Sequence, residues 1–288
     1  FIQEHNIRIS GGNEHIQTGL SIGYLDQEGV VKFTDAKKVS INFNSTVKYG
    51  QFKAGINVSA NYRNYNEPHY GISDYMQLAM RALPVMTPYL ADGSYGRSWV
   101  VTPGQNAFGN MLACKDGENN YKQTRIVSSA FAEYVFPYDI KYNVTLGIRK
   151  VDLTRRYFQP ATYTYNPKTL EPQKMIANTT AMNTANDDIN PSISQTINWS
   201  HKFNGKHDIS ALLGMNYEEF NAWSFSARGQ NGYLDNELTE VGLATTFLKP
   251  SSSSSKVRLL SYFGRLNYDY ADRYLFEMNL RYDGSSRF

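Results

Sequence analysis

The residues of this chain that are best suited to bind a ligand are aromatic and polar. Tyr89, Asp92, Tyr95 and Trp99 lie close together in the sequence, and Trp223 stands further along the chain. Sugar rings stack on aromatic faces, and their hydroxyls need amide or carboxylate partners. We therefore interpret these residues as candidate substrate contacts. The alternative is that the rings pack against their own loops or against a covering lid.

Residue types that make or break covalent bonds show no catalytic pattern. The five histidines are scattered, and the sequence contains neither a His-x-x-x-His nor a Gly-x-Ser-x-Gly motif. Asp187 and Asp188 carry oxygen ligands for calcium, but their spacing fits no known calcium loop. Cys114 is the only cysteine, so we interpret it as an incidental thiol in a loop. The sequence predicts no enzyme, no metal site and no cofactor.

The elements that position these residues follow a period of two. From Ile16 to Tyr24 apolar or aromatic side chains alternate with small polar ones, and the same period recurs over 39–47 and 140–148. Strands of about ten residues with one apolar and one polar face are typical of a transmembrane β-barrel. The polar face is rich in Ser, Thr, Asn and Gly, which favours a barrel over a soluble β-sandwich.

The composition agrees with a membrane barrel. The chain has 288 residues with a formal net charge of +3, and its mean hydropathy is -0.50. No stretch approaches the roughly twenty apolar residues of a membrane helix. Aromatic residues make up 14% of the chain, with 22 Tyr, a residue suited to membrane interfaces. The sequence shows no basic stripe, so we expect no nucleic acid partner.

Ten strands are predicted, and the connections between them alternate between short and long. The short ones are hairpin turns containing Gly, Asn, Asp or Pro. The long ones are Asp26–Ala36, Tyr65–Asn120, Leu153–Ile189 and Asn221–Ser255. Bacterial barrels alternate short periplasmic turns with long extracellular loops in this way. The predicted strands are His5–Ser10, His15–Leu25, Lys37–Lys48, Phe52–Asn64, Tyr121–Phe136, Ile140–Asp152, Asn190–Lys202, His207–Phe220, Lys256–Tyr270 and Tyr274–Asp283.

Three local features complete this prediction. A short helix is expected over Ser73–Leu83, with Ser73 as its N-cap and Pro84 ending it. Ser251–Ser255 is interpreted as a flexible loop tip. The alternation is weakest over Tyr121–Phe136, where a bulge or a plug-facing stretch would explain it.

The predicted fold class is all-β. We expect about ten strands in one antiparallel up-and-down meander, curved like part of a barrel wall and open at both edges. The apolar face should be convex and lipid-facing, so its side chains should be exposed when no lipid is present. The residues predicted to face lipid are Ile16, Leu20, Ile22, Val39, Ile41, Phe43, Ile56, Val58, Val144, Leu146, Ile209, Leu213, Met278 and Leu280.

Several sequence strings follow one another in an order known from a protein family. These are Ile9–Glu14, Gly23–Val30, Arg81–Tyr89 with Asp92–Tyr95, Ser261–Tyr268 and Leu280–Phe288. Together they resemble the SusC/RagA-type TonB-dependent outer-membrane transporters of Bacteroidetes. The resemblance spans nearly the whole chain, and the strings Asp-Gln-Glu-Gly and Asp-Gly-Ser-Ser-Arg-Phe are its most specific parts.

The resemblance implies a 22-stranded barrel in the bacterial outer membrane that imports oligosaccharides or peptides. It also implies a SusD-like surface lipoprotein as lid and a TonB complex that acts through an N-terminal plug. On this interpretation, residues 1–288 are an excerpt of the barrel domain, without the plug, the TonB box or the C-terminal strands. The alternatives are a siderophore or cobalamin receptor, a surface adhesin without transport, and a secreted carbohydrate-active enzyme.

Overall fold

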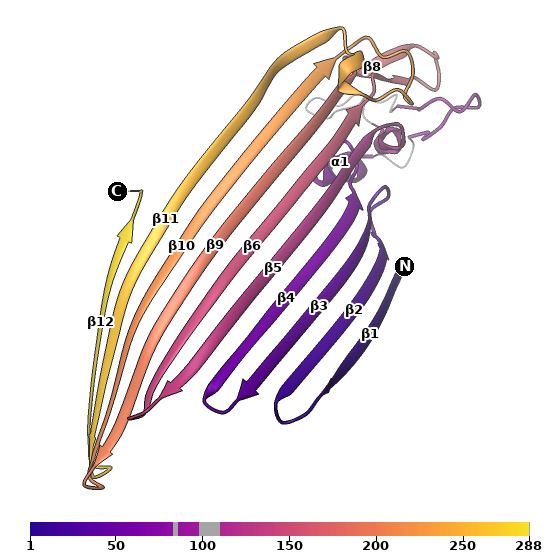
Figure 1. Ribbon diagram of the computed structural model, residues 1–288. Coiled ribbons are helices and arrows are strands. Elements are labelled where there is room, and N and C mark those ends of the chain that lie inside the picture. Colours follow the sequence, from indigo (N-terminus) through magenta and orange to yellow (C-terminus); the bar gives the residue numbers. More distant parts are fainter. Residues whose placement is uncertain (83–85, 98–109, 288) are drawn as a thin grey trace.

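The computed structural model describes residues 1–82, 86–97 and 110–287. Its main feature is a ten-stranded antiparallel sheet in which the strands pair in chain order (Figure 1). The predicted single meander is confirmed, with β1 and β12 at its two edges. The strands are β1 (Ile2–Gly12), β2 (Ile16–Glu28), β3 (Asp35–Tyr49), β4 (Phe52–Asn66), β5 (Glu118–Phe136), β6 (Ile140–Gln159), β9 (Thr180–Phe203), β10 (His207–Gln230), β11 (Thr246–Tyr270) and β12 (Tyr274–Ser285).

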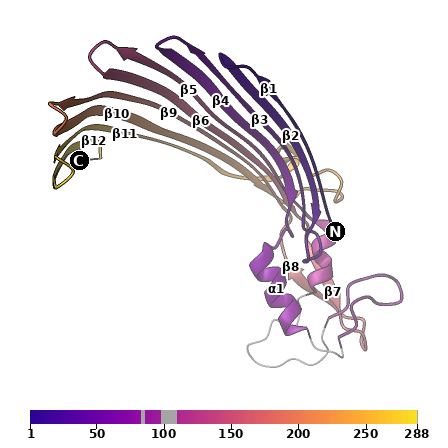
Figure 2. The same ribbon diagram turned by 90° about the horizontal axis from the view of Figure 1, so that it is seen from below.

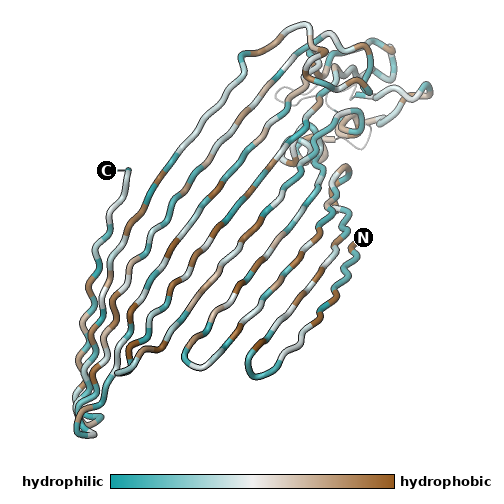
Figure 3. Tube along the Cα trace, in the orientation of Figure 1, coloured by the Kyte–Doolittle hydropathy of each residue, from teal (hydrophilic) through white to brown (hydrophobic). Residues whose placement is uncertain are grey.

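The strand register brings the alternating apolar positions of neighbouring strands onto one face. Ile22 of β2 lies opposite Ile7 and Ile41, for example, and Leu146 of β6 lies opposite Ala130 and Ile193. Figure 3 shows the resulting alternation along each strand. By this register every residue predicted to face lipid lies on the same face, and none of them is buried. We call this side the outer face and the polar side the inner face.

The sheet is curved, and the inner face is its concave side. Figure 2 shows the sheet as an arc with helix α1 (Ile72–Arg81) beneath its concave side at the loop end. Arg63 and Tyr65, which belong to the inner face, line a cavity together with Ile72 of α1. The apolar outer face is therefore convex, as predicted for a barrel wall.

The short connections lie at one end of the sheet and have the backbone of tight hairpin turns. Three of them contain two consecutive residues with positive φ: Tyr138–Asp139, Asn204–Gly205 and Ala271–Asp272. A fourth turn has Gly50 at a φ of 55°. Positive φ at both central positions matches the right-handed twist of the flanking strands. These turns fall where the sequence predicted them.

The strands extend further at the loop end than the sequence predicted. β9 and β10 each have 24 residues and β11 has 25. At about 3.3 Å per residue they are roughly 80 Å long, whereas the apolar band of such barrels is only about 25 Å tall. The predicted loops over 153–189 and 221–255 are therefore too long. Ser251–Ser255 is not a flexible tip, because these residues pair with β10 within β11.

Two smaller predictions are wrong. Helix α1 begins at Ile72 with Gly71 as its N-cap, and no side chain caps it, so Ser73 lies inside the first turn. Pro84 lies outside the described residues. β5 pairs with β4 and β6 without any register shift, so it contains no bulge. Its apolar inner residue Phe131 lies over Gly55, which explains the mixed alternation.

Most buried side chains lie at the loop end, where connecting segments pack on the strands. The β4–β5 and β6–β9 connections form what we call the loop-end lobe: residues 67–82, 86–97, 110–117 and 160–179. It contains α1, the short helix η1 (Met111–Asp116) and a hairpin of β7 (Thr162–Tyr165) and β8 (Pro172–Ile176), which the sequence did not predict. Within the described residues, no helix is long and apolar enough to cross a membrane.

Candidate functional site

The two connections of the loop-end lobe are joined by backbone contacts. The Tyr165 N–H donates to the Tyr95 carbonyl at 2.8 Å, and the Arg97 N–H donates to the Tyr165 carbonyl at 2.9 Å. The Tyr70 hydroxyl donates to the sulfur of Met175 at 3.4 Å. Two segments that are distant in the sequence, separated by 105 residues in the case of Tyr70 and Met175, therefore form one body at the loop end of the sheet.

Three of the predicted contact residues lie together in this lobe. The rings of Tyr89 and Tyr95 are 5.7 Å apart between centroids, and the two residues form a β-bridge. Asp92 closes the turn between them by accepting hydrogen bonds from the Ser94 hydroxyl at 2.7 Å and the Ser94 N–H at 3.0 Å. These bonds lower the pKa of Asp92. The Tyr95 hydroxyl donates to Asp116 at 2.8 Å, and burial together with this carboxylate raises the pKa of Tyr95.

The other two predicted contact residues are not part of this cluster. Trp99 lies outside the described residues. Trp223 lies within β10 and not at the start of a loop, and the register puts it on the outer face. Its ring is nearly parallel to that of Phe225, with 6.3 Å between centroids.

The interior of the lobe is built around buried polar side chains. Asn110, 2% exposed, donates to the carbonyls of Pro88 at 2.8 Å and Gly96 at 3.0 Å, and accepts from the Leu112 N–H at 2.9 Å. His69 is 3% exposed, and burial lowers its pKa to about 4. Cys114 lies in η1 and is buried, which raises its pKa to about 12. Its thiol is therefore protonated and a poor nucleophile.

An array of stacked side chains on the inner face, beside the lobe, was not predicted. The guanidinium of Arg63 lies 4.3 Å from the ring centroid of Tyr65, which stacks on Tyr121 at 4.7 Å with an interplanar angle of 4°. The guanidinium of Arg155 lies 5.1 Å from the Tyr121 centroid and 4.9 Å from that of Tyr157. We call these five residues the Arg–Tyr ladder. Cation–π contacts of this kind hold the guanidinium groups in place.

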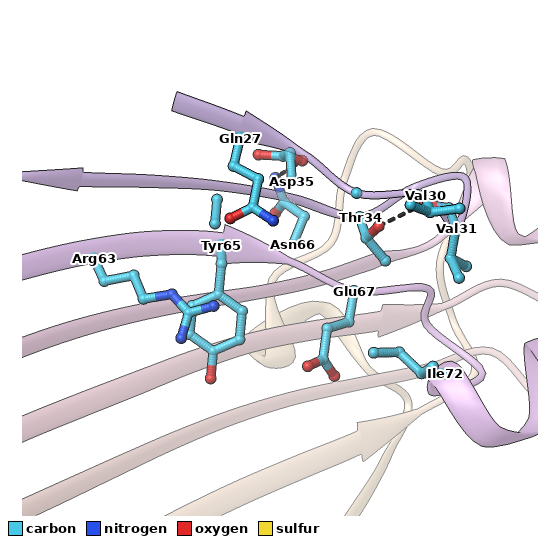
Figure 4. A pocket seen from close by; sticks show the side chains of 12 residues that line it. Gln27, Val30, Val31, Thr34, Asp35, Arg63, Tyr65, Asn66, Glu67 and Ile72 are labelled. Carbon is cyan, nitrogen blue, oxygen red and sulfur yellow. Dashed lines mark hydrogen bonds between the residues drawn. The ribbon is translucent and has the colours of Figure 1, made fainter. Parts of the chain in front are cut away.

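The ladder borders a cavity of about 240 Å³ between the ends of β2, β3 and β4 and the start of α1 (Figure 4). Gln27, Asp35, Asn66 and Glu67 supply polar groups to its lining. The Asn66 amide donates to Asp35 at 2.9 Å. This cavity is open to solvent and offers several hydrogen-bonding groups, which suits a polar ligand.

Metal binding finds no support in the described parts of the chain. No group of three or more His, Cys, Asp or Glu side chains is placed there to hold an ion. Asp187 and Asp188 are neighbours within β9. Successive side chains of a strand point to opposite faces, so the two carboxylates cannot share one ion.

Comparisons with known proteins connect this architecture to a class of receptors. No protein-family model matches the chain. TonB-dependent receptor P3 of Formosa agariphila is 26% identical over the whole chain, which covers 28% of that receptor. TonB-dependent receptor SusC of Bacteroides thetaiotaomicron is 22% identical over 99% of the chain, which covers 29% of SusC. The structure of the RagAB peptide transporter matches 100% of the chain, and 32% of its own chain, with a TM-score of 0.78 and 18% identity.

The chain is homologous to TonB-dependent receptors of the SusC/RagA type. It spans less than a third of the length of these curated relatives. A siderophore receptor, the ferripyoverdine receptor of Pseudomonas aeruginosa, shares the fold less closely, with a TM-score of 0.55 and 11% identity. The ten-stranded sheet therefore corresponds to part of the barrel of these TonB-dependent receptors, and its location is the bacterial outer membrane. The relatives described above are named as receptors and transporters.

Proposed function

We propose that this chain forms part of the wall of an active importer that carries oligosaccharides or peptides across the outer membrane. The observation that carries the proposal is the two-faced sheet. Its outer face is apolar yet exposed, with Leu213 at 66% and Leu146 at 53%, whereas its inner face is polar. Such a sheet separates lipid from a water-filled path. Its similarity to SusC and to the RagAB peptide transporter supports import as the activity.

In this proposal residues 1–288 act as a single unit of the barrel domain, and the partners are those that the family resemblance implies. A SusD-like lipoprotein would cover the mouth, and a TonB complex would act through a plug. Binding of cargo would favour a closed arrangement of lid and loops, and pulling on the plug would then open the path. No covalent step and no cofactor is needed, so we propose that the chain is not an enzyme.

The loop-end lobe would lie at the mouth of this path and meet cargo first. Tyr89, Asp92 and Tyr95 present two rings and one exposed carboxylate there. We keep Trp99 and Trp223 as proposed contacts, although Trp223 lies on the outer face, where contact with the lid or with lipid headgroups fits better than contact with cargo inside.

The test is uptake by cells that carry or lack the full-length transporter. Fluorescent oligosaccharides and peptides of several sizes would be offered with and without a protonophore, which removes the energy that TonB uses. We expect deletion to abolish uptake of one cargo class, and we expect the protonophore to do the same. Uptake that is insensitive to both treatments would contradict the proposal.

The alternatives give different results in the same cells. A siderophore or cobalamin receptor would restore growth on scarce iron or cobalamin and leave oligomer uptake unchanged. An adhesin would change attachment to surfaces and would have no uptake to lose.

A further inference from the structure

Charged side chains are unevenly distributed over the inner face. The register assigns mostly cations to the inner face of β3–β6 and a mixture of both signs to that of β9–β12. The inner residues of β3–β6 are Lys38, Lys48, Lys53, Arg63, Arg125, Lys141, Arg149 and Arg155, with Glu133 as the acid. Those of β9–β12 are Asp188, Asp208, Glu218, Asp269, Glu277 and Asp283, with Lys202, Arg228, Arg265 and Arg281.

Five of these cations form a group near the loop end, which we call the basic inner patch: Lys38, Arg63, Arg125, Arg149 and Arg155. Lys38 lies directly opposite Arg63. Arg125 lies opposite Asn61, two residues before Arg63, and Arg149 lies opposite Val127, two residues after Arg125. Diagonal neighbours of this kind are about 7–8 Å apart between Cα atoms. The sequence shows no basic run because the five residues come from four strands.

Among the described residues, no acidic side chain forms an ion pair with the patch, although Asp188 of β9 is an inner-face diagonal neighbour of Arg149. Elsewhere on the inner face Lys141 pairs with Glu133, and Arg281 pairs with Asp283. Glu67 lines the same cavity as Arg63, at the edge of the lobe (Figure 4). Cations held close together without partners repel one another and attract anions.

The Arg–Tyr ladder fixes the orientation of two of these cations, Arg63 and Arg155, which favours binding of an anionic ligand. Arg63 stacks on Tyr65 and Arg155 stacks on Tyr121, so both guanidinium planes are held by ring faces. Stacking leaves N–H groups along the edge of a guanidinium, and these donate in pairs to a carboxylate or sulfate. The Arg155 Nε already donates to Asn119 at 2.8 Å, which further restricts its orientation.

We propose that the basic inner patch binds cargo that carries repeated anionic groups, an oligosaccharide with carboxylate or sulfate substituents. This inference rests on the proposed import function and specifies its substrate class. The inner positions around the cations include amides and hydroxyls, which pair with sugar hydroxyls: Ser40, Asn61, Gln123 and Asn190. Val127 and Val151 also lie there, opposite Arg149 and Arg125, so the choice of an oligosaccharide over a peptide rests on these amides and hydroxyls.

The test measures binding to the full-length transporter, purified with its lipoprotein partner, by titration calorimetry. The probes are an oligosaccharide of uronic acids, a neutral glucose oligosaccharide of the same length, and a peptide of Glu and Gly. The test variant is R63Q/R125Q/R149Q. One control, R63K/R125K/R149K, keeps the charge, and the other, R265Q, removes an inner-face cation outside the patch. Gel mobility with and without heating confirms that each barrel is assembled.

We expect the uronic acid oligosaccharide to bind about tenfold more tightly than the neutral one. Its affinity should fall as the salt concentration is raised. The glutamine variant should lose about tenfold in affinity for it, and R265Q should lose little. The lysine variant should lose an intermediate amount, because it keeps the charge but not the paired donors of the guanidinium. Equal affinity for the charged and neutral oligosaccharides, tighter binding of the acidic peptide, or an unchanged glutamine variant would overturn the inference. Energy-dependent uptake of the neutral oligosaccharide without any preference for anions would leave the import proposal standing. Absence of any energy-dependent uptake would overturn both.

Discussion

The middle of the sheet exposes apolar side chains, whereas the loop-end lobe buries polar ones. In the sheet Ile22, Leu146 and Leu213 are exposed on the outer face, whereas in the lobe His69 and Asn110 are buried. The exposed apolar side chains make sense because lipid covers them in a membrane, which removes the cost of contact with water. The buried polar side chains make sense because hydrogen bonds replace water at most of their atoms. The comparison teaches that each region is adapted to a different solvent.

The largest effect is expected from a charge placed on the lipid side of the sheet. In the full-length transporter, Leu146→Arg should lower barrel stability by about 2–4 kcal/mol, because the guanidinium would enter hydrocarbon. Thr145→Arg is the matched control, since Thr145 is the preceding residue of β6 and lies on the inner face. It should leave stability nearly unchanged and alter uptake. Urea unfolding followed by heat-modifiable gel mobility measures the first quantity, and cargo uptake the second. Equal losses of stability at both positions would show that the two faces do not meet lipid and water.

A comparable effect is expected from removing a buried amide of the lobe. Asn110→Ala leaves the Pro88 and Gly96 carbonyls and the Leu112 N–H without their side-chain partner. We expect the local stability of the lobe to fall by about 2–3 kcal/mol, because buried unsatisfied groups are costly. Asp92→Ala is the control, because Asp92 is exposed and bonds only within its own turn. Hydrogen exchange over residues 110–117 measures both variants. A larger loss of local stability in Asp92→Ala than in Asn110→Ala would mean that the buried hydrogen bonds of Asn110 do not stabilise the lobe.

Acidification should weaken the lobe through His69 and leave the apolar outer face unaffected. Burial holds the pKa of His69 at about 4, below its usual 6.5, so the unfolded lobe binds a proton that the folded lobe excludes. The neutral His69 therefore stabilises the folded lobe fully above about pH 6.5, and this stabilisation is lost as the pH falls towards 4. The free energy of unfolding of the lobe should fall by about 2 kcal/mol between pH 7 and pH 5. Protease susceptibility of residues 67–117 across this range measures the loss.

The control for this pH effect is a histidine outside the lobe. His69→Gln should flatten the pH dependence, whereas His5→Gln, in the exposed strand β1, should preserve it. If both variants keep the wild-type pH profile, the titrating group is not His69.

The sequence predicted the sheet well because strand faces depend on local alternation. The alternation of the residues around Leu146 and Thr145 is enough to assign the two side chains to opposite faces. The sequence Asn204–Gly205 by itself predicts a tight turn. The run Ser251–Ser255 misled the prediction because small polar residues are common in loops, whereas pairing with β10 decides its conformation.

The candidate site was predicted only in part because most of it depends on contacts that are distant in sequence. Tyr89 and Tyr95 are close neighbours in the chain, and the structure brings them together. The Arg–Tyr ladder combines β4, β5 and β6, so Tyr65 and Arg155 meet Tyr121 only once the register is fixed. No local pattern specifies that register across one hairpin and a long connection.

The smallest effect is expected where an aromatic ring covers a glycine on the inner face. A Cβ on Gly214 would lie 2.2 Å from the Phe263 ring on the neighbouring strand, whereas one on Gly284 would meet nothing closer than 3.7 Å. Gly214→Ala should therefore displace the ring and lower barrel stability by about 1 kcal/mol, at the low end for overpacking because the ring can swing towards the open inner side. Gly284→Ala should be nearly neutral by the same urea measurement. A loss at Gly214 as large as that of Leu146→Arg would mean that the inner face is packed against other parts of the protein along this strand and does not border water.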